Sequence, residues 1–415
     1  MSPRRSALEV LRVFLRLGLT SFGGPIAHLA YFRAEFVDRR RWVTDEQFTQ
    51  HLALAQFLPG PASSQLGFAI GLQRAGILGG AAAFAGFTLP SILLLFSLAI
   101  AGASVGGPWW LGTVHGLKLV AVVVVADGLW KMARALTPDA ARVGIAAVSA
   151  SIVVWLGTAD AQLMALAVGA AAGLLLFRGA ALGPTASRED PVPRKKHQSF
   201  STVTRASLAG SVVMLVVFVV LLASALSIRD TGPSLLTLGT SFVRAGSLVF
   251  GGGHVVLPLL QESVVSSGWL SSDAFLTGYG AAQAVPGPMF SFAAYLGALT
   301  PWSGASPYVA SNALGALVAV LAIFTPGFLL VAAALPLWTH ISANVMARRV
   351  ILGVNAAVVG LLGAALYNPV ITSGISGGAD VAIVLAGFAL HRRLPRPALW
   401  LLLWCVSAAL AVQRL

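Results

Sequence analysis

The chain has 415 residues, of which 57% are hydrophobic and only 10% charged, and its mean hydropathy is +0.85. A soluble domain of this size would expose large apolar surfaces to water, so the composition excludes that class and predicts an integral membrane protein. The formal charge of +13 does not indicate nucleic-acid binding, because Lys and Arg fall in short clusters between apolar spans.

Apolar stretches of about 20 residues or more recur along the chain and predict membrane-spanning helices. Each could cross roughly 30 Å of hydrocarbon as an α-helix. Alternation with a period of two is absent, which argues against a β-barrel. We therefore expect an all-α polytopic membrane protein with spans that include residues 77–102, 207–228 and 309–335.

The N-terminal segment has a basic start and an apolar body, as a signal peptide would. However, Glu9, Arg12 and Arg16 interrupt that body at helical spacing, whereas a signal peptide has an uncharged core. We expect instead an amphipathic first helix that is retained, with its N-terminus in the cytoplasm.

Four segments of the first half are too short to cross a membrane, and each pair is broken at Gly or Pro. Glycine permits a sharp reversal, and proline favours the start of the next helix, where its missing N–H costs nothing. We expect two hairpins of half-helices, because non-helical backbone at membrane depth must be packed in protein or line a cavity. The predicted half-helices are residues 7–21 and 25–38 around Gly23 and Gly24, and residues 45–58 and 62–74 around Pro59, Gly60 and Pro61.

Lys118 and Asp127 lie within one apolar span, at a spacing that places them on nearly opposite faces of a helix. They are therefore not expected to pair. Farther along the chain, the polar segment from residue 178 to residue 206 is rich in Pro and basic residues and predicts a cytoplasmic linker.

The second half repeats the motifs of the first half in the same order. Phe22-Gly23-Gly24 is answered by Phe250-Gly251-Gly252, Trp42 by Trp269, and AQFLPGP by AQAVPGP, and Lys118 is aligned with Asn355. We predict an N-terminal repeat over residues 1–177, the linker over residues 178–206, and a C-terminal repeat over residues 207–415 that begins with an added span at residues 207–228.

Basic residues orient the two halves, because short cytoplasmic loops carry an excess of Lys and Arg. The basic run Arg39 to Arg41 corresponds to a neutral loop in the second half, and Arg348-Arg349 corresponds to an uncharged loop in the first. Equivalent loops would then lie on opposite faces. This pattern predicts inverted-topology repeats whose broken half-helices meet near the midplane, an architecture that is common among secondary transporters.

The helices that restart after each break, near Pro25, Ala62, Gly253 and Met289, are expected to direct their N-termini towards this midplane. A helix N-terminus offers free N–H donors and a partial positive charge, which suits a tetrahedral oxyanion. The two Arg residues could neutralise a dianion. We predict substrate-binding residues at Arg16, Gly23, Gly24, Gln56, Pro59, Gly60, Pro61, Ser63, Ser64, Lys118, Arg244, Gly251, Gly252, Gln283, Pro286, Gly287, Pro288, Ser291 and Asn355.

Some of these sequence features could instead have a purely structural role. Pro and Gly kinks are common in membrane helices, and Arg16 could simply complete the polar face of the first helix. Glu35 and Glu262 are proton-coupling candidates, but Glu35 could equally pair with Arg33 and neighbouring basic groups. We expect His28 and His254 to form hydrogen bonds to neighbouring groups rather than to bind a metal ion. No metal, cofactor or catalytic residue is predicted.

In this combination and order, the motifs resemble those of the chromate ion transporter family in its long, two-domain form, over roughly residues 10–180 and 205–410. The resemblance rests on Gly23, Gly24, Trp42, Pro59, Gly60, Pro61, Gly251, Gly252, Trp269, Pro286, Gly287 and Pro288. It implies a multi-pass protein of the bacterial inner membrane that exports chromate and confers resistance, with sulfate as the competitor. The second half departs from the first at Ser272, where the first has Asp45, so the acidic pair is not duplicated.

Export of a dianion from an inside-negative cell gains about 4.6 kcal/mol per 100 mV, so membrane potential or a proton gradient suffices as the driving force. A Walker loop for ATP is absent from the sequence. The alternatives are a sulfate or other divalent oxyanion carrier, an anion channel, and a membrane-embedded enzyme, for which the sequence offers no nucleophile and base within a span. A homodimer is among the assemblies that the sequence leaves open.

Overall fold

The computed structural model describes residues 3–104, 107–156, 159–177, 205–228, 232–250, 255–302, 309–338, 341, 344–393 and 398–412. These residues form helices and connecting turns, without a strand among them, as the sequence predicted. Within the described ranges, five helical stretches are long and apolar enough to cross a membrane: Ala62–Gly102, Trp109–Leu136, Leu208–Ser227, Asn312–Leu337 and Val345–Gly374. The prediction of an all-α polytopic membrane protein is confirmed.

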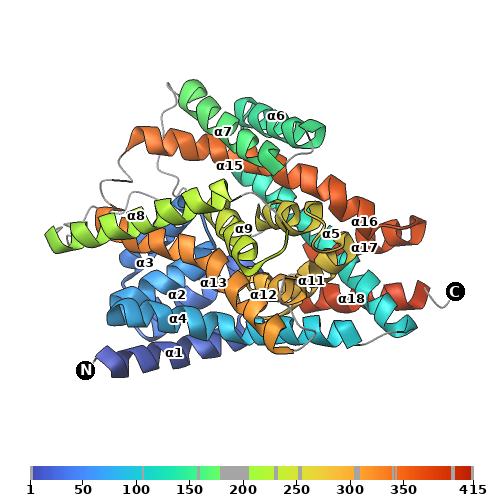
Figure 1. The fold of residues 1–415 in the computed structure, drawn as a ribbon, viewed down its shortest axis with the longest axis horizontal. Helices are drawn as coiled ribbons and strands as arrows, with labels where there is room; N and C mark the ends of the chain where they lie inside the picture. The colour runs from blue at the N-terminus through green and yellow to red at the C-terminus, as the bar shows by residue number, and fades with distance from the viewer. Residues whose placement is uncertain are drawn as a thin grey trace.

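The first half contains short helices followed by long ones (Figure 1). Two of its helices, α4 and α5, are candidate spans. Its elements are α1 (Pro3–Thr20), α2 (Gly24–Arg33), the π-helix η1 (Ala34–Arg39), α3 (Asp45–Phe57), α4 (Ala62–Ser104), α5 (Pro108–Leu136), α6 (Ala140–Leu156) and α7 (Ala159–Leu176).

The second half has the same order of elements after one added helix, α8 (Arg205–Ser227). Its short helices are α9 (Leu235–Leu248), α10 (Val256–Gln261), η3 (Glu262–Ser266), α11 (Ser272–Ala284), η4 (Met289–Ser291) and α12 (Phe292–Leu299). The later elements are α13 (Val309–Ala334), η5 (Leu335–Leu337), α15 (Val345–Ala365), η6 (Leu366–Ile371), α16 (Thr372–Gly374), α17 (Gly378–Arg393) and α18 (Ala398–Val412).

The helix breaks predicted in the first half are confirmed. Helix α1 ends at Thr20 and α2 begins at Gly24, where Gly23 and Gly24 have φ values of 101° and 74° that favour glycine. Helix α3 ends at Phe57 and α4 begins at Ala62. Helix α4 is itself interrupted at Ala75 and Gly76, where the dihedral angles are not helical. The depth of these breaks in a bilayer remains a prediction.

Local capping explains where the helix after each Trp motif begins. Thr44 accepts a hydrogen bond from Gln47 N–H, and the Gln47 side chain accepts one from Thr44 N–H, which forms a capping box at the start of α3. Ser271 caps α11 at the equivalent place, because its hydroxyl accepts from Ala274 N–H. The two helices are therefore started by equivalent polar residues.

In each half, one long helix packs against the last two helices of the other half. Helix α5 of the first half packs against α17 and α18 of the second, whereas α15 of the second half packs against α6 and α7 of the first (Figure 1). Glycines permit both approaches. A Cβ atom at Gly116 would lie 2.5 Å from Val406 Cα, and one at Gly353 would lie 2.0 Å from the Gly169 carbonyl oxygen. Buried residues of both halves form one large hydrophobic core, so the halves make a single body.

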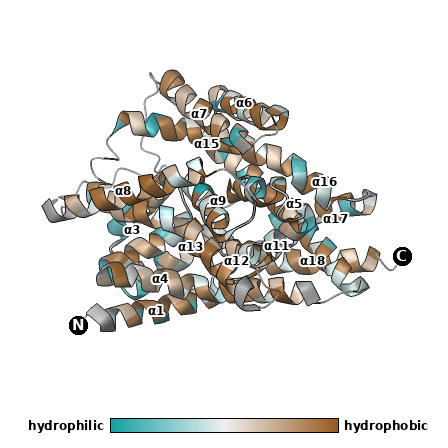
Figure 2. Ribbon diagram, in the orientation of Figure 1, coloured by the Kyte–Doolittle hydropathy of each residue, from teal (hydrophilic) through white to brown (hydrophobic). Residues whose placement is uncertain are grey.

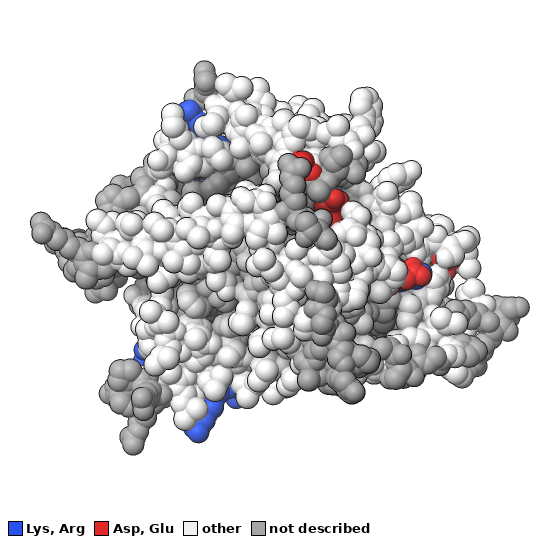
Figure 3. Space-filling view, in the orientation of Figure 1, with Lys and Arg blue, Asp and Glu red and all other residues white. Residues whose placement is uncertain are grey.

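The outside of the molecule is largely apolar. Figure 2 shows hydrophobic residues along α8, and only 11% of the most apolar stretch of this helix is buried within the structure. Charged atoms are sparse on the face shown in Figure 3. Such a surface would be costly in water and matches contact with lipid.

The predicted domain boundaries and the inversion of the two halves are not tested by these contacts. Most of the predicted linker, residues 178–204, lies outside the described residues. Helix α8 begins at Arg205, close to the predicted start of the C-terminal repeat at residue 207.

Candidate functional site

The two Pro-Gly-Pro turns form equivalent hydrogen bonds to the opposite half. Gly60 N–H donates to the Val249 carbonyl oxygen at 2.7 Å, and Gly287 N–H donates to the Ser21 carbonyl oxygen at 3.0 Å. In the alignment of the halves, Ser21 corresponds to Val249 and Gly60 to Gly287. Each turn is therefore tied to the residue that precedes the other half's Phe-Gly-Gly motif, as a two-fold relation between the halves would require.

The central glycine of each turn is needed for close packing as well as for its conformation. Gly60 and Gly287 have φ values of 126° and 100°. A Cβ atom at Gly287 would lie 2.9 Å from Ser91 Oγ on α4, and one at Gly60 would lie 3.2 Å from Gly327 Cα on α13. Each turn thus rests against the longer broken helix of the opposite half.

Buried hydroxyl groups surround these turns. Ser91 Oγ lies 2.6 Å from Ser291 Oγ. His28 links the two Gly and Pro breaks of the first half, because its Nδ1 lies 3.4 Å from Ser63 Oγ and its Nε2 lies 3.2 Å from the Ser21 carbonyl oxygen. We call the set of buried polar residues around the turns the polar centre: Ser21, His28, Ser63, Ser64, Thr88, Ser91 and Ser291.

Several of these buried hydroxyl groups have unused hydrogen-bonding capacity. Within the described residues, Ser21 Oγ, Ser64 Oγ and Thr88 Oγ1 are buried without a hydrogen-bond partner. A hydroxyl can donate one hydrogen bond to an oxyanion without adding charge. Ser63 and Ser64 also lie in the first turn of α4, where the helix dipole favours an anion. The polar centre therefore offers neutral donors together with a helix N-terminus.

Gln65, which the sequence did not predict as a site residue, holds the first turn in place. The Gln65 Nε2 group donates to the carbonyl oxygens of Pro59 at 2.8 Å and Gly327 at 3.2 Å. Gln56 is exposed, and Gln283 Nε2 lies 3.0 Å from Met289 Sδ. The sequence signal that could have identified Gln65 is an amide in the first turn of an apolar helix, where burial obliges it to find backbone partners.

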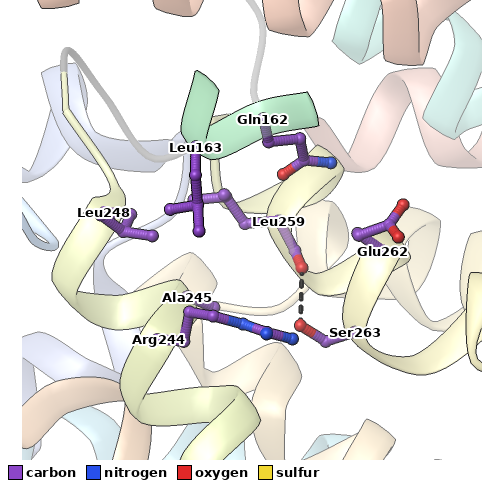
Figure 4. A pocket seen from close by; sticks show the side chains of 8 residues that line it. All are labelled: Gln162, Leu163, Arg244, Ala245, Leu248, Leu259, Glu262 and Ser263. Carbon is purple, nitrogen blue, oxygen red and sulfur yellow. Dashed lines mark hydrogen bonds between the residues drawn. The ribbon is translucent and has the colours of Figure 1, made fainter. Parts of the chain in front are cut away.

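Arg244 lies in a narrow pocket between the halves (Figure 4). Its side chain points towards Ser263, whose hydroxyl donates to the Leu259 carbonyl oxygen at 2.9 Å. The free space holds about one water molecule. The lining combines α7, α9, α10 and η3 through Gln162, Leu163, Arg244, Ala245, Leu248, Leu259, Glu262 and Ser263. Glu262 thus shares the pocket with Arg244. The sequence did not indicate that these two residues lie together.

Arg16, which corresponds to Arg244, is not placed in such a pocket. It is exposed on α1, and its carbonyl oxygen accepts a hydrogen bond from Thr20 Oγ1 at 2.9 Å. This placement fits the alternative in which Arg16 completes the polar face of an amphipathic helix. Its substrate-binding role remains a prediction that this conformation does not support directly.

Lys118 is paired, but with a residue that sequence reasoning did not find. Its Nζ atom lies 2.9 Å from Asp273 Oδ1, at the start of α11 in the other half. Asp127 pairs instead with Lys131 at 2.6 Å, which confirms that Lys118 and Asp127 are not partners. Asn355, aligned with Lys118, has a buried Oδ1 atom without a partner in the described part of the chain.

Glu35 lies in the first turn of η1 and takes part in a network of ion pairs. Its Oε1 atom accepts from Arg40 Nε at 2.6 Å and also from Arg39. Arg33, the other basic neighbour considered from the sequence, pairs with Asp45 at 2.9 Å. The carboxylate of Glu35 is therefore engaged by basic groups in this conformation, whereas Glu262 lines the Arg244 pocket.

Part of the predicted site lies outside the described residues. Gly251, Gly252 and His254, with the third glycine of this break, fall in residues 251–254. Two groups of the remaining predicted positions lie together, and Arg16, Gln56 and Lys118 belong to neither group. Gly60, Ser63, Ser64, Gly287 and Ser291 meet at the polar centre, whereas Arg244 and Glu262 line the separate pocket.

The sequence model of the family described as chromate transporter matches residues 8–174 and 236–412. The chromate transport protein of Pseudomonas aeruginosa is 28% identical over 374 residues, which cover 87% of this chain and 80% of that protein. The probable chromate transport protein of Synechococcus elongatus is 27% identical over 405 residues, or 95% and 93% of the two chains. The chromate transport protein of Cupriavidus metallidurans is 26% identical over 371 residues, which cover 87% of this chain and 82% of that protein. No solved structure matches the chain.

Proposed function

The chain belongs to the chromate transporter family, a family of transporters rather than enzymes, and from this premise we propose that it exports chromate through the polar centre. The observation that carries the proposal is the meeting of two broken-helix turns around buried hydroxyl groups without hydrogen-bond partners. Membrane potential or a proton gradient would drive the export, and chromate resistance would result.

The chemistry of the polar centre suits a tetrahedral dianion. Chromate presents four oxygen atoms that accept hydrogen bonds, and the buried hydroxyl groups of Ser21, Ser64 and Thr88, which lack a partner within the described residues, could donate to them. The N-terminus of α4 adds a partial positive charge without a counter-ion that must be displaced. Sulfate has the same charge and shape, so we propose it as a competitor and as the alternative substrate.

The Arg244 pocket gives the proposal a route to proton coupling. Arg244 and Glu262 bring opposite charges into one pocket, which reduces its attraction for an anion while both are ionised. Uptake of a proton by Glu262 would leave the positive charge of Arg244 to attract the dianion. The pocket is too narrow for chromate in this conformation, so binding there requires it to widen.

The proposed direction follows from charge and topology. The basic loops that contain Arg39 to Arg41, and Lys131 to Arg142, would face the cytoplasm of a bacterial inner membrane, with the N-terminus on the same side. Two negative charges that leave an inside-negative cell gain about 4.6 kcal/mol per 100 mV. Export therefore needs no ATP.

Chromate accumulation in cells tests the proposal. Cells with the wild-type protein should accumulate less chromate than cells without it, and added sulfate should weaken the difference. Arg244→Ala should abolish most of the difference at equal membrane abundance. Arg12→Ala is the matched control, because Arg12 is exposed on α1. Equal accumulation with and without the wild-type protein would refute chromate export, and sulfate transport without chromate transport would favour the alternative.

A further inference from the structure

The contacts between the two halves follow the two-fold relation except at one place. Helix α11 packs along α5, with its N-terminus near Lys118. By symmetry, α3 should pack along α15, but among the described residues it has no comparable contact with that helix. Helix α3 packs on α4 and α13, and Leu54 belongs to a hydrophobic cluster with Val331 and Ala334 of α13. One side of the molecule is therefore closed between the halves where the equivalent side is not.

The closed side combines a close backbone approach with an ion pair. A Cβ atom at Gly280 would lie only 2.0 Å from the Leu117 carbonyl oxygen, so α11 and α5 touch through their backbones. One residue farther along α5, the largely buried Lys118 reaches Asp273 at 2.9 Å. Since α5 belongs to the first half and α11 to the second, both contacts must break if the halves separate here.

The equivalent residues on the other side stand apart. Glu46 corresponds to Asp273 and is exposed at the start of α3, and Ala53 corresponds to Gly280 and is exposed as well. Asn355 corresponds to Lys118, and its buried Oδ1 atom lacks a partner in the described part of the chain. The counterparts of Asp273 and Gly280 are therefore exposed on this side of the molecule.

We propose that Lys118 and Asp273 are gating residues of the transporter, and that Asn355 and Glu46 are their counterparts in the opposite conformation. The proposal rests on the transport function proposed above. In one state α11 lies on α5, as here. In the other state these helices separate and α3 closes on α15, where the Asn355 amide donates to the Glu46 carboxylate. The polar centre lies between the two gates and opens to one side at a time.

The two gates differ in strength. Lys118 and Asp273 form an ion pair, whereas an amide and a carboxylate form a single charge-assisted hydrogen bond. Gly280 allows backbone contact, whereas the methyl group of Ala53 would keep α3 farther from α15 in the proposed opposite state. The resting protein therefore favours the state in which α5 and α11 are closed. In the proposed topology this gate faces outward, so the resting exporter is open towards the cytoplasm, where it takes up chromate.

The surrounding charges leave the proposed pair intact. One turn before Lys118 on α5, His115 Nε2 lies 2.8 Å from Asp380 Oδ1 on α17. That contact joins α5 to α17, a pairing that the other half repeats between α15 and α6. It is therefore expected to persist in both states, and α11 alone moves away from α5.

Thiol labelling tests the gate without reference to chromate. Cys405 is replaced by Ser, and Thr277→Cys provides a reporter that is buried on α11 one turn from Asp273. Lys118→Ala should accelerate labelling of the reporter by a membrane-impermeant maleimide about fivefold, the effect of a modest ion pair. Lys131→Ala is the matched control, because Lys131 pairs with Asp127 within α5.

Three further double variants make the outcome decisive. The double variant Lys118→Asp with Asp273→Lys should return labelling to the starting rate and show that loss of the pair, rather than misfolding, opened the gate. A flexible bis-maleimide that joins Lys118→Cys to Asp273→Cys should stop chromate flux. The same reagent on Lys131→Cys and Asp127→Cys should not. Equal labelling of the Lys118→Ala and Lys131→Ala variants would overturn the gate, while wild-type chromate transport would still stand.

Discussion

Ser64 is a buried serine whose hydroxyl oxygen has no hydrogen-bond partner in the described part of the chain. If this hydroxyl donates to the transported oxyanion, Ser64→Ala should lower the kcat/KM for chromate transport about tenfold, which corresponds to about 1.4 kcal/mol. Protein stability should change little, because Ser64 Oγ makes no hydrogen bond within the described residues that could be lost. The measurement is initial chromate flux at several concentrations, normalised to membrane abundance.

Ser149→Ala is the control for this prediction. Ser149 is also a buried serine without a partner for its hydroxyl in the described residues, but it lies on α6, outside the polar centre. Its substitution should leave chromate flux unchanged. If both variants lose flux equally, burial rather than contact with substrate explains the effect of Ser64→Ala.

The charged and amide residues show what the sequence could predict at this scale. Spacing along one helix was sufficient to separate Lys118 from Asp127. It could not identify Asp273 as the partner of Lys118, because that contact joins helices far apart in the sequence. Gln65 was missed for the same reason, since one of its two carbonyl partners, Gly327, belongs to the other half.

Among the helices, α15 and α7 cross at a point where neither can carry a side chain. A Cβ atom at Gly353 would lie 2.0 Å from the Gly169 carbonyl oxygen and 2.8 Å from Gly173 Cα. Gly353→Ala should therefore force these helices apart and destabilise the protein by about 1–3 kcal/mol. The measurement is the Tm in detergent, which should fall.

Gly144→Ala provides a contrast of opposite sign. Gly144 lies within α6, and nothing approaches its missing side chain within 4 Å. Ala is favoured over Gly inside a helix by about 1 kcal/mol, so this substitution should leave the Tm unchanged or raise it. If Gly353→Ala raised the Tm as well, the close approach of α15 and α7 would be refuted.

The ends of the helices were largely predictable, whereas their partners were not. Pro59, Gly60 and Pro61 interrupt a helix through local sterics, so the break between α3 and α4 could be located from the sequence. Non-helical dihedral angles at Ala75 and Gly76 end the helix that begins at Ala62, where the sequence predicted the half-helix over residues 62–74 to end. That α5 packs on α18, and α15 on α7, follows from side-chain packing that hydropathy does not encode.

For the whole molecule, the proposed inverted orientation of the halves makes a prediction about accessibility. The loop with Thr137 and the loop with Ser376 occupy equivalent places, but the proposed topology puts them on opposite faces. With Cys405 replaced by Ser, Thr137→Cys should react with an impermeant maleimide only from the cytoplasmic side, and Ser376→Cys only from outside. Labelling of both from the same side would contradict the inverted topology and leave the packing of the helices unaffected.

The most direct measurement is chromate efflux from liposomes that contain the purified protein, under a potassium diffusion potential. The account predicts saturable efflux that is faster when the interior is negative, slower when the potential is reversed, inhibited by sulfate and reduced by Ser64→Ala. Efflux equal to that of protein-free liposomes, at either potential, would contradict the central claim that this chain carries chromate through its polar centre.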